Sequence, residues 1–320
     1  MIYQKLVGPI LRRLTKRDPE TAHQMAIKAL KLFGDSEFFR KKMGRFTFVH
    51  NPALRQNIFG IKFNNPVGLA AGFDKNAKIT KCLDSLGFGF MAVGSITSDN
   101  MGEVALRLLA QRREFSSTLL GISIEKSETV SLNEAADDYL LSLRSVYALG
   151  DYFEISLNAP EFQERYFVNH LLESINEARI KLSLKGGGGI KPILIKIPPD
   201  INGGILNDLL DGGSVDGVIV ADLSMIKRIY QYTYGRLPII AAGGIFTAKD
   251  AHEALMAGAS LIQISKEMMR EGPFIARNIN RGLVKIFERD GIGNISDLRG
   301  KAVDNRKGCF TVRRQGCYRA

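Results

Sequence analysis

The sequence predicts an α/β fold, a (β/α)8 TIM barrel with an N-terminal helical extension. Eight short apolar runs are spaced along the chain, mostly separated by helix-like stretches. Runs without polar alternation are typical of strands buried on both faces, as in parallel sheets covered by helices. Eight such strands in βαβα order indicate a barrel. The predicted strands are residues 67–71, 90–94, 120–124, 152–157, 192–197, 217–221, 238–242 and 261–265.

The length fits this division of the chain. At 320 residues, a barrel of about 250 residues plus a terminal extension fits better than two equal domains. We expect an extension over residues 1–50, a barrel over 51–290 and a basic C-terminal tail over 291–320. In the extension, an apolar stripe from Leu6 to Leu14 predicts one helix, and Asp18-Pro19-Glu20 predicts the start of a second. The tail has little apolar periodicity, so we expect it at the surface.

The positive charge of the chain is concentrated at its ends. The net charge is +11, of which residues 1–50 carry +7 and residues 301–320 carry +5. Basic ends on a near-neutral barrel favour anionic partners there, and no module typical of nucleic-acid binding accompanies them. An amphipathic basic helical pair fits contact with a membrane surface. It equally fits a small helical cap with solvated charge, and the charge pattern leaves both interpretations open.

Cysteine usage and hydropathy give three further expectations. No apolar run approaches the roughly 18 residues of a membrane span, and no secretory signal pattern is evident. The three cysteines, Cys82, Cys309 and Cys317, are too few for a disulfide framework, which favours a reducing compartment. No His or further Cys accompanies the C-terminal pair, so we expect no metal site there.

Glycines follow the seventh predicted strand, and a serine closes the eighth. Gly243 and Gly244 come directly after residues 238–242, and Ser265 ends the strand at 261–265. Barrels of this type often hold a phosphate with the loops after strands 7 and 8, where backbone N–H groups approach the phosphate oxygens. The alternative is a tight turn that needs glycine for its own geometry. We favour the phosphate interpretation.

Two lysines occupy positions where barrels place their chemistry. Lys75 follows the first strand, and Lys196 lies within the otherwise apolar fifth strand. A lysine in a buried strand is unfavourable unless it meets an acceptor or an anion. Lys196 is therefore either paired with a neighbouring carboxylate such as Glu154 or Asp222, or it stabilises negative charge on a cofactor ring. We favour the second interpretation.

Further motifs accompany the two lysines and the glycine turn. They are Asp18-Pro19-Glu20-Thr21-Ala22-His23, Asn65-Pro66 with residues 67–75, Gly87-Phe88-Gly89, Asp137-Asp138-Tyr139, Ile195-Lys196-Ile197, Gly217-Val218-Ile219, Gly243-Gly244 and Ala257-Gly258-Ala259-Ser260-Leu261. With these motifs, the chain resembles the membrane-associated, quinone-using dihydroorotate dehydrogenases over about residues 1–290. That family is an FMN-containing barrel that oxidises dihydroorotate to orotate, and its N-terminal helices form the quinone entrance at the membrane. The resemblance implies a peripheral membrane protein, on the cytoplasmic face of a bacterial inner membrane or at a mitochondrial inner membrane.

The resemblance also implies roles for individual residues. Lys196 matches the lysine expected near the N1 and O2 edge of the flavin, and Gly244 matches the phosphate turn. Lys75 matches a lysine that contacts both flavin and substrate. Ser95 stands where a threonine is usual. The implied cofactor-binding set is Ala71, Gly72, Lys75, Ser95, Lys196, Gly243, Gly244 and Ser265.

The substrate side departs from the family pattern. The fourth strand ends in Ser156-Leu157-Asn158-Ala159-Pro160-Glu161 where Asn-Ile-Ser-Ser-Pro-Asn is typical, so Ala159 occupies the position of the catalytic base. Loss of a general base commonly lowers the rate roughly 10²–10⁴-fold. Glu161 and Asp222 place carboxylates where neutral side chains contact the orotate anion, which predicts repulsion.

Further departures affect the flavin side and the loops. Ser123 replaces a flavin-contacting asparagine, and Ser265-Lys266-Glu267 replaces a Tyr-Ser/Thr-Gly loop, which sets a carboxylate beside the expected phosphate. An Asn-Arg-Met-Gly-Phe stretch before the third strand and a Leu-Ser-Gly loop after the sixth have no counterpart.

Three hypotheses therefore stand. The first is an FMN oxidoreductase of the dihydroorotate dehydrogenase type with an altered or impaired substrate site. The second is a catalytically inactive relative with a structural or regulatory role beside a protein partner. The third is a barrel that binds another phosphorylated ligand at the glycine turn.

Overall fold

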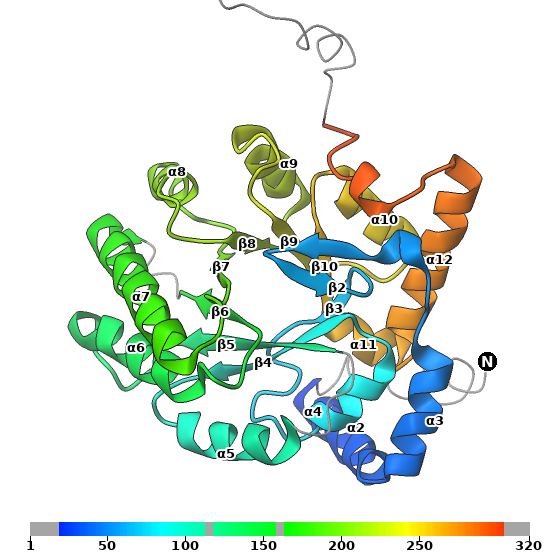
Figure 1. Ribbon diagram of the computed structural model, residues 1–320, viewed down its shortest axis with the longest axis horizontal. Helices are drawn as coiled ribbons and strands as arrows, with labels where there is room; N and C mark the ends of the chain where they lie inside the picture. The colour runs from blue at the N-terminus through cyan, green and yellow to red at the C-terminus, as the bar shows by residue number, and fades with distance from the viewer. Residues whose placement is uncertain (1–18, 113–117, 158–162, 304–320) are drawn as a thin grey trace, which may run out of the picture.

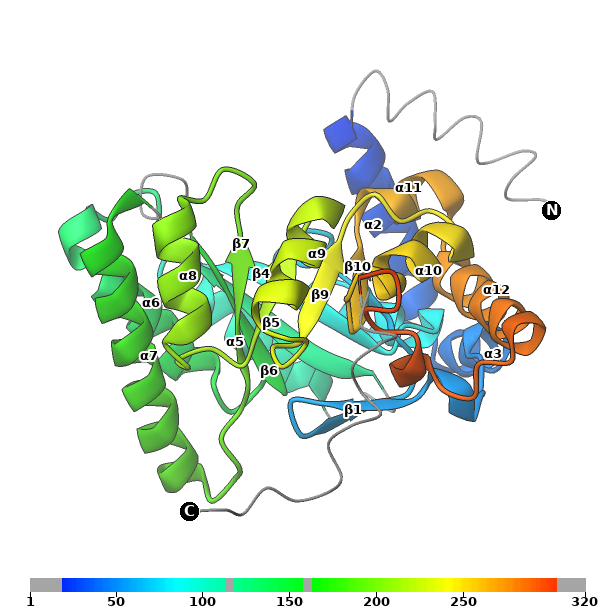
Figure 2. The ribbon, with the colours of Figure 1, turned by 90° about the horizontal axis from the view of Figure 1, so that it is seen from above.

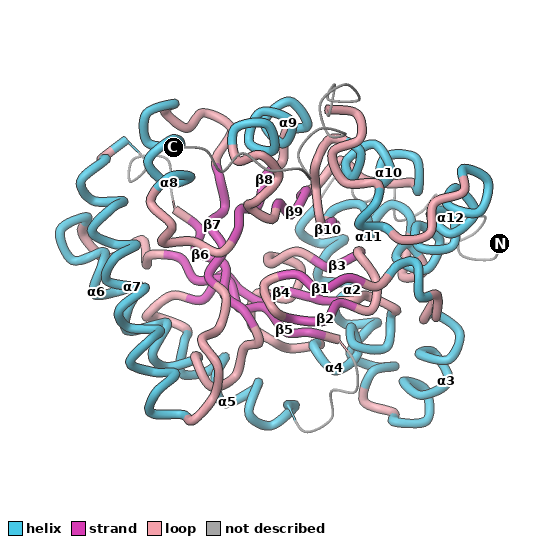
Figure 3. Tube along the Cα trace, turned by 45° about the horizontal axis from the view of Figure 1, so that its top comes forward, coloured by secondary structure: helices cyan, strands magenta, loops and turns pink. Residues whose placement is uncertain are grey.

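The structure is a computed structural model that describes residues 19–112, 118–157 and 163–303. Within these ranges, eight parallel strands close into a barrel with helices outside, which confirms the predicted fold (Figures 1 and 3). Each strand lies within a few residues of its predicted run. The barrel strands are β3 (Val67–Leu69), β4 (Phe90–Ile96), β5 (Leu119–Glu125), β6 (Tyr152–Ser156), β7 (Ile193–Ile197), β8 (Gly217–Val220), β9 (Ile239–Ala242) and β10 (Leu261–Ile264).

Helices connect consecutive strands and cover the outside of the barrel. Their apolar faces pack on the outward-facing residues of the strands, so both faces of each strand are buried. The short β8–β9 connection holds one helix, as its length predicts. The helices are α4 (Thr80–Leu83), α5 (Met101–Arg112), α6 (Ala135–Val146), α7 (Arg165–Gly186), α8 (Gly203–Asp211), α9 (Leu223–Tyr232), α10 (Ala248–Met256), α11 (Lys266–Glu271) and α12 (Ile275–Asp290), with 3₁₀ turns η2 (Pro52–Leu54), η3 (Asp84–Leu86), η4 (Leu132–Glu134) and η6 (Ile295–Asp297).

A β-hairpin covers the amino-terminal end of the barrel. Strands β1 (Gln56–Ile58) and β2 (Ile61–Phe63) pair antiparallel. Phe63 packs edge-to-face on Phe90 with ring centroids 5.4 Å apart, and Phe90 packs in the same manner on Tyr152 at 6.3 Å. Both partners begin barrel strands, so the hairpin closes the end where the strands start. The remaining buried members of this interior cluster are Leu194, Ile219, Ile240 and Leu261.

Two helices precede the barrel in the described part of the chain. Helix α2 (Pro19–Gly34) begins at the predicted proline, and α3 (Glu37–Thr47) follows after a short turn. In Figure 2, α2 and α11 lie on the side of the barrel opposite the hairpin strand β1. The apolar stripe from Leu6 to Leu14 lies outside the described residues.

The chain after α12 packs against the barrel for at least thirteen residues. Most residues of the segment 291–303 are exposed or half-buried, but the segment is docked on the barrel. Ile295 and Leu298 are buried, and the guanidinium of Arg299 donates hydrogen bonds to the carbonyls of Gly235, Leu237 and Gly258. Ile295 and Leu298 lie three positions apart and anchor the segment, but two apolar residues are too few to show a periodic pattern in the sequence.

Candidate functional site

The carboxyl ends of the strands form the mouth of the barrel, and Lys196 lies near the end of β7 on this side. In the β6–β7 register, Glu154 lies opposite Leu194 and Ser156 lies opposite Lys196. Successive side chains of a strand point to opposite faces, so Lys196 shares the interior face with Leu194, a member of the interior cluster. The side chain of Lys196 is nevertheless exposed. It makes no ion pair or hydrogen bond with any other described residue, and it therefore presents a free ammonium group at the mouth.

Beneath Lys196, the barrel interior holds one buried carboxylate. Glu154 is 2% exposed, and its Oε1 accepts a hydrogen bond from Nε2 of Gln263. The hydroxyl of Tyr152 lies 3.4 Å from the same oxygen. Burial raises the pKa of Glu154, and the hydrogen bond from Gln263 and the charge of Lys196 oppose that rise. Of the two carboxylates expected near Lys196, Glu154 is the one that senses its charge.

The other carboxylate, Asp222, caps a helix. One of its oxygens accepts the N–H of Met225 at 2.8 Å and the hydroxyl of Ser224, which is the N-cap arrangement of α9. The hydrogen bond from Ser224 lowers the pKa of Asp222. The carboxylate that sequence comparison places near a substrate anion is thus engaged by the backbone of α9.

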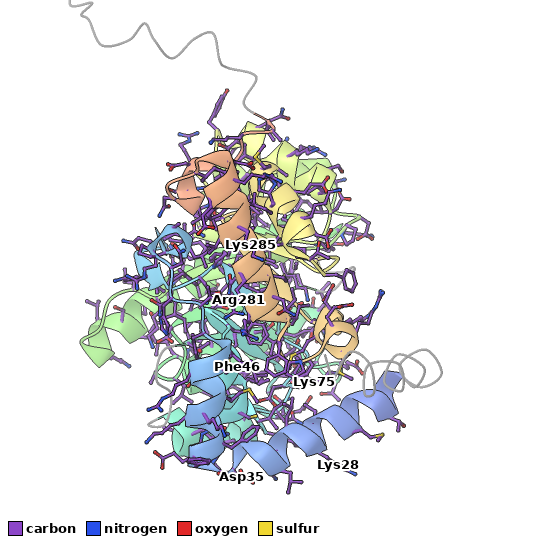
Figure 4. All side chains as sticks on the ribbon, turned by 90° about the vertical axis from the view of Figure 1, so that its right-hand side faces the viewer. Lys28, Asp35, Phe46, Lys75, Arg281 and Lys285 are labelled. Atoms are coloured by element: carbon purple, nitrogen blue, oxygen red, sulfur yellow. The ribbon has the colours of Figure 1, made fainter. Side chains whose placement is uncertain are left out.

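The loop that carries Lys75 is held by a buried aspartate. Oδ1 of Asp74 accepts the N–H of Lys78 at 2.7 Å, and Oδ2 accepts the N–H of Ile79 at 3.1 Å and the hydroxyl of Thr80 at 2.8 Å. Burial raises the pKa of Asp74, and these hydrogen bonds oppose the rise. Lys75 itself is exposed, without an ion-pair or hydrogen-bond partner among the described residues, and Figure 4 shows it on the side of the molecule that carries α2 and α11.

The expected flavin contacts after β3 and β4 lie on neighbouring strand ends. The N–H of Gly72 donates to the carbonyl of Gly94 at 2.7 Å, which ties the two loops together. Gly72 has a φ of +94°, and a Cβ at this position would meet no atom within 4 Å, so the space beside it is open. Ala71, Gly72 and Ser95 are half-buried at this edge. With Lys75 they form one side of the mouth.

The expected phosphate turn is engaged by a side chain of the chain itself. Gly243 and Gly244 have φ values of +79° and +73°, in the left-handed region that glycine favours. The N–H of Gly244 donates to Oε1 of Glu267 at 2.6 Å, and the N–H of Ser265 donates to Oε2 at 2.7 Å. Glu267 is 5% exposed. Its carboxylate lies between the loops after β9 and β10, where barrels of this kind hold phosphate.

The mouth therefore fits only one end of an FMN molecule. Lys75 and Lys196 supply positive charge of the kind that suits an anionic ring, and the space beside Gly72 is open. At the other end, two backbone donors expected to hold a phosphate already donate to Glu267. The phosphate end does not fit the residues as they lie, and the assignment of Gly243, Gly244 and Ser265 to cofactor binding stays a prediction.

The altered substrate residues are placed only in part. Ser123 is buried on β5 and lies opposite Glu154 in the β5–β6 register, while Ser156 is half-buried beside Lys196. Asn158, Ala159 and Glu161 lie outside the described residues, so the assignment of Ala159 to the base position rests on the sequence. Cys309 and Cys317 also lie outside them.

Sequence reasoning missed the role of three residues in this mouth. These are Asp74 as the anchor of the Lys75 loop, Gln263 as the partner of Glu154, and Glu267 as a ligand of two backbone N–H groups. A signal was present for Gln263, because it is the one amide in the apolar run of residues 261–265. The resemblance placed the carboxylate of Glu267 beside the expected phosphate, but no local pattern predicts that it accepts these two backbone N–H groups.

The N-terminal helices form a second feature beside the barrel. A cavity of about 520 Å³ is lined by Phe38, Phe39, Lys42, Met43, Arg45, Phe46 and Phe274. Phe46 packs edge-to-face on Phe274 at 5.7 Å, and the guanidinium of Arg277 lies 3.9 Å from the centre of the Phe46 ring (Figure 4). Across the described ranges, no helix combines the length and apolar character needed to span a bilayer. The same ranges contain no group of three or more His, Cys, Asp or Glu side chains arranged to hold a metal ion.

Comparison with known proteins gives one consistent family. The family model described as dihydroorotate dehydrogenase matches residues 53–103 and 205–287. The chain is 30% identical to the dihydroorotate dehydrogenase (quinone) of Nostoc sp., with 93% of this chain and 98% of the relative covered. It is 28% identical to that of Nostoc punctiforme, with 96% and 100% covered.

Solved structures agree with the sequence relatives. The crystal structure of DHODH from Eimeria tenella in complex with ferulenol superimposes with a TM-score of 0.77 at 26% identity, over 93% of this chain and 99% of that one. The ligand-free structure from the same organism gives 0.75 at 25% identity, over 90% and 100%. With near-complete coverage in both directions and the same closed barrel, the chain belongs to the family of quinone-dependent dihydroorotate dehydrogenases.

Proposed function

We propose that this chain is a dihydroorotate dehydrogenase-type barrel whose oxidation of dihydroorotate is absent or strongly reduced. One feature of the sequence supports the proposal: the resemblance to the family places Ala159, which has no group to accept a proton, at the position of the catalytic base. Loss of a general base alone lowers the rate by roughly 10²–10⁴-fold. Ser156 stands in place of a substrate-binding asparagine and lies opposite Lys196 in the β6–β7 register. Its side chain is shorter and lacks the amide, so we expect weaker substrate binding and a further loss of rate.

The proposal is tested by restoring the base. The purified chain, supplied with excess FMN or riboflavin, dihydroorotate and a quinone analogue, is expected to turn over at least roughly 100-fold more slowly than the Nostoc relative. The variant A159S, alone or with S156N, is expected to gain activity. The matched control is A302S, which adds the same hydroxyl at an exposed residue far from the mouth. Turnover by the unchanged chain at the rate of the relative would contradict the proposal.

A second candidate is a flavin oxidoreductase that acts on a different substrate. It is favoured by the two free ammonium groups of Lys75 and Lys196, which suit an anionic ring at the mouth. Flavin released from the purified protein on denaturation, together with inactivity toward dihydroorotate, would support this candidate. A third, an inactive subunit beside a protein partner, predicts neither flavin nor turnover.

We also infer that residues 1–50 form the membrane and quinone side of the molecule, 51–290 the barrel and 291–320 a basic tail. The apolar cavity between α3 and Phe274 supports this inference. The exposed basic residues Lys42 and Arg45 of α3 line it, and Figure 4 shows Arg281 and Lys285 further along α12. Such a surface suits anionic headgroups around an apolar entrance, and a peripheral location at an inner membrane follows. Co-sedimentation with anionic vesicles, weakened in the variant F38S/F46S, tests it.

A further inference from the structure

Glu267 bridges two loops that are adjacent at the mouth of the barrel. Strands β9 and β10 run parallel, with Ala242 opposite Gln263, and the N–H of Gly243 continues the ladder to the carbonyl of Gln263 at 3.0 Å. The next backbone donors of the two loops are those of Gly244 and Ser265. One oxygen of Glu267 binds each of them. The carboxylate thus joins the two loops with two short, charge-assisted hydrogen bonds.

The position of Glu267 is fixed by its surroundings. It lies in the first turn of α11, which is anchored by the buried side chains of Met268 and Met269. Its Oε1 lies 3.8 Å from the place where a Cβ on Gly243 would be, at ordinary van der Waals distance, so the carboxylate lies directly beside the glycine turn. A buried side chain with both oxygens hydrogen-bonded does not leave its place without loss of those bonds.

A phosphate monoester and this carboxylate need the same two donors. Bound phosphates at this place in barrels are held by backbone N–H groups of the loops after strands 7 and 8. A phosphate monoester carries about 1.5 to 2 negative charges at neutral pH. It would meet a buried negative charge at a distance where like charges repel strongly, and it would find Gly244 and Ser265 already donating.

We propose that Glu267 is a built-in occupant of the phosphate cradle, so that the chain excludes ligands that end in a phosphate monoester and accepts the unphosphorylated ring instead. For a flavin, this means preference for riboflavin over FMN. The inference deepens the proposed function, because it concerns the ligand of the same mouth. It does not depend on turnover, since its test measures binding alone.

The test compares FMN with riboflavin on the intact chain and on the variant E267A. Binding is followed by quenching of flavin fluorescence, and inorganic phosphate is added as a separate probe in thermal unfolding. The unchanged chain is expected to bind FMN no more tightly than riboflavin and to show no stabilisation by phosphate. E267A is expected to gain roughly 10- to 100-fold in affinity for FMN relative to riboflavin, because two backbone donors become available to the phosphate.

Two further variants make the result specific. E267Q keeps the length of the side chain without its charge, and a smaller gain for FMN is expected. E271A removes one negative charge from the same helix α11 and is expected to leave the ratio of the two affinities unchanged. An FMN-to-riboflavin ratio that does not change between the intact chain and E267A overturns the inference. If both Glu267 variants fail to fold, an intact chain that prefers FMN by tenfold or more overturns it, and one that does not supports it.

The outcomes separate this inference from the proposed function. Fast oxidation of dihydroorotate by the intact chain would contradict the proposed function, whatever the affinity ratio is. A changed ratio in E267A would support the cradle inference even if A159S restored no activity.

Discussion

The two ends of this barrel are built from opposite kinds of side chain. At the closed end, the rings of Phe63, Phe90 and Tyr152 pack edge-to-face and are almost completely buried. At the mouth, Lys75 and Lys196 reach solvent without an ion-pair or hydrogen-bond partner among the described residues. The difference explains how a family fold can be kept while residues at its mouth change. Packing at one end stabilises the barrel, so residues at the other end can be replaced without loss of the fold.

Removal of an aromatic ring from the closed end gives the strongest test of whether packing there stabilises the barrel. Phe90→Ala is expected to lower the free energy of unfolding by about 3–5 kcal/mol, because the cavity it leaves is enclosed on all sides by Phe63, Tyr152 and the hairpin. Urea denaturation followed by circular dichroism measures the change. The control Phe38→Ala truncates a ring that is 77% exposed and is expected to alter stability by less than about 0.5 kcal/mol. A loss below 1 kcal/mol for Phe90→Ala would argue against the closed end as the main source of stability.

A smaller effect is expected from the anchor of the Lys75 loop. Asp74→Ala removes the acceptor of three hydrogen bonds and leaves two backbone donors without their partner, which is expected to cost about 2–3 kcal/mol. Asp74→Asn keeps one acceptor and is expected to lose less. Urea denaturation gives the stability, and proteolysis under native conditions reports whether the loop opens. Asp137→Ala, at an exposed position of α6, is the control. Equal stability of Asp74→Ala and the control would mean that the loop is held by its apolar contacts alone.

The closed end was the easier part to predict from sequence. Each barrel strand is a continuous apolar run, and burial on both faces leaves that signature in the sequence itself. The hairpin strands β1 and β2 were missed, because three-residue strands such as Gln56–Ile58 carry too little alternation to show a period.

At the mouth, sequence identified residues but not their partners. Lys75, Lys196 and the glycine turn were found because charge and glycine are unusual beside apolar strands. The engagement of Gly244 by Glu267 depends on two loops brought together only by β9–β10 pairing, which no local pattern encodes. The role of Asp222 was also not predictable, because a carboxylate directly after a strand is equally typical of a ligand contact and of a helix N-cap. The family model also leaves residues 104–204 unmatched, the stretch that holds β5, β6 and β7.

The buried carboxylate of Glu154 lies between the two ends, and the pH dependence of stability tests its protonation state. Burial raises its pKa above the ordinary 4.5, so the folded state holds the proton more tightly than the unfolded state. Stability is therefore expected to fall as pH rises from about 4.5 through the raised pKa. Glu154→Gln removes that dependence and keeps an acceptor for Gln263. In thermal unfolding between pH 4 and pH 8, the melting temperature of the variant should rise relative to that of the unchanged chain as pH increases. If the melting temperature of Glu154→Gln instead falls relative to that of the unchanged chain as pH rises, Glu154 is stabilised in its charged form.

The smallest change in stability is expected at the mouth itself. Lys196→Met removes an exposed ammonium group that has no ion-pair or hydrogen-bond partner among the described residues. At the acid end of the pH range, where Glu154 is protonated, the free energy of unfolding should therefore change by less than about 0.5 kcal/mol. Its effect should appear in the pH profile, because the charge of Lys196 opposes the raised pKa of Glu154. Without that charge, the pKa of Glu154 rises further, and the loss of stability extends to higher pH.

The double variant Glu154→Gln/Lys196→Met makes this last prediction specific. If the two side chains sense each other across the β6–β7 register, Lys196→Met should shift the pH profile of the unchanged chain and leave the profile of Glu154→Gln as it was. Equal shifts in both backgrounds would mean that the lysine acts on some other group. If Lys196→Met shifts the pH profile in neither background, the ammonium group of Lys196 lies in solvent, too far from the barrel interior to stabilise negative charge on a bound ring. The mouth would then resemble the closed end in having no free charge directed at a ligand, and the contrast between the two ends would reduce to a difference in packing.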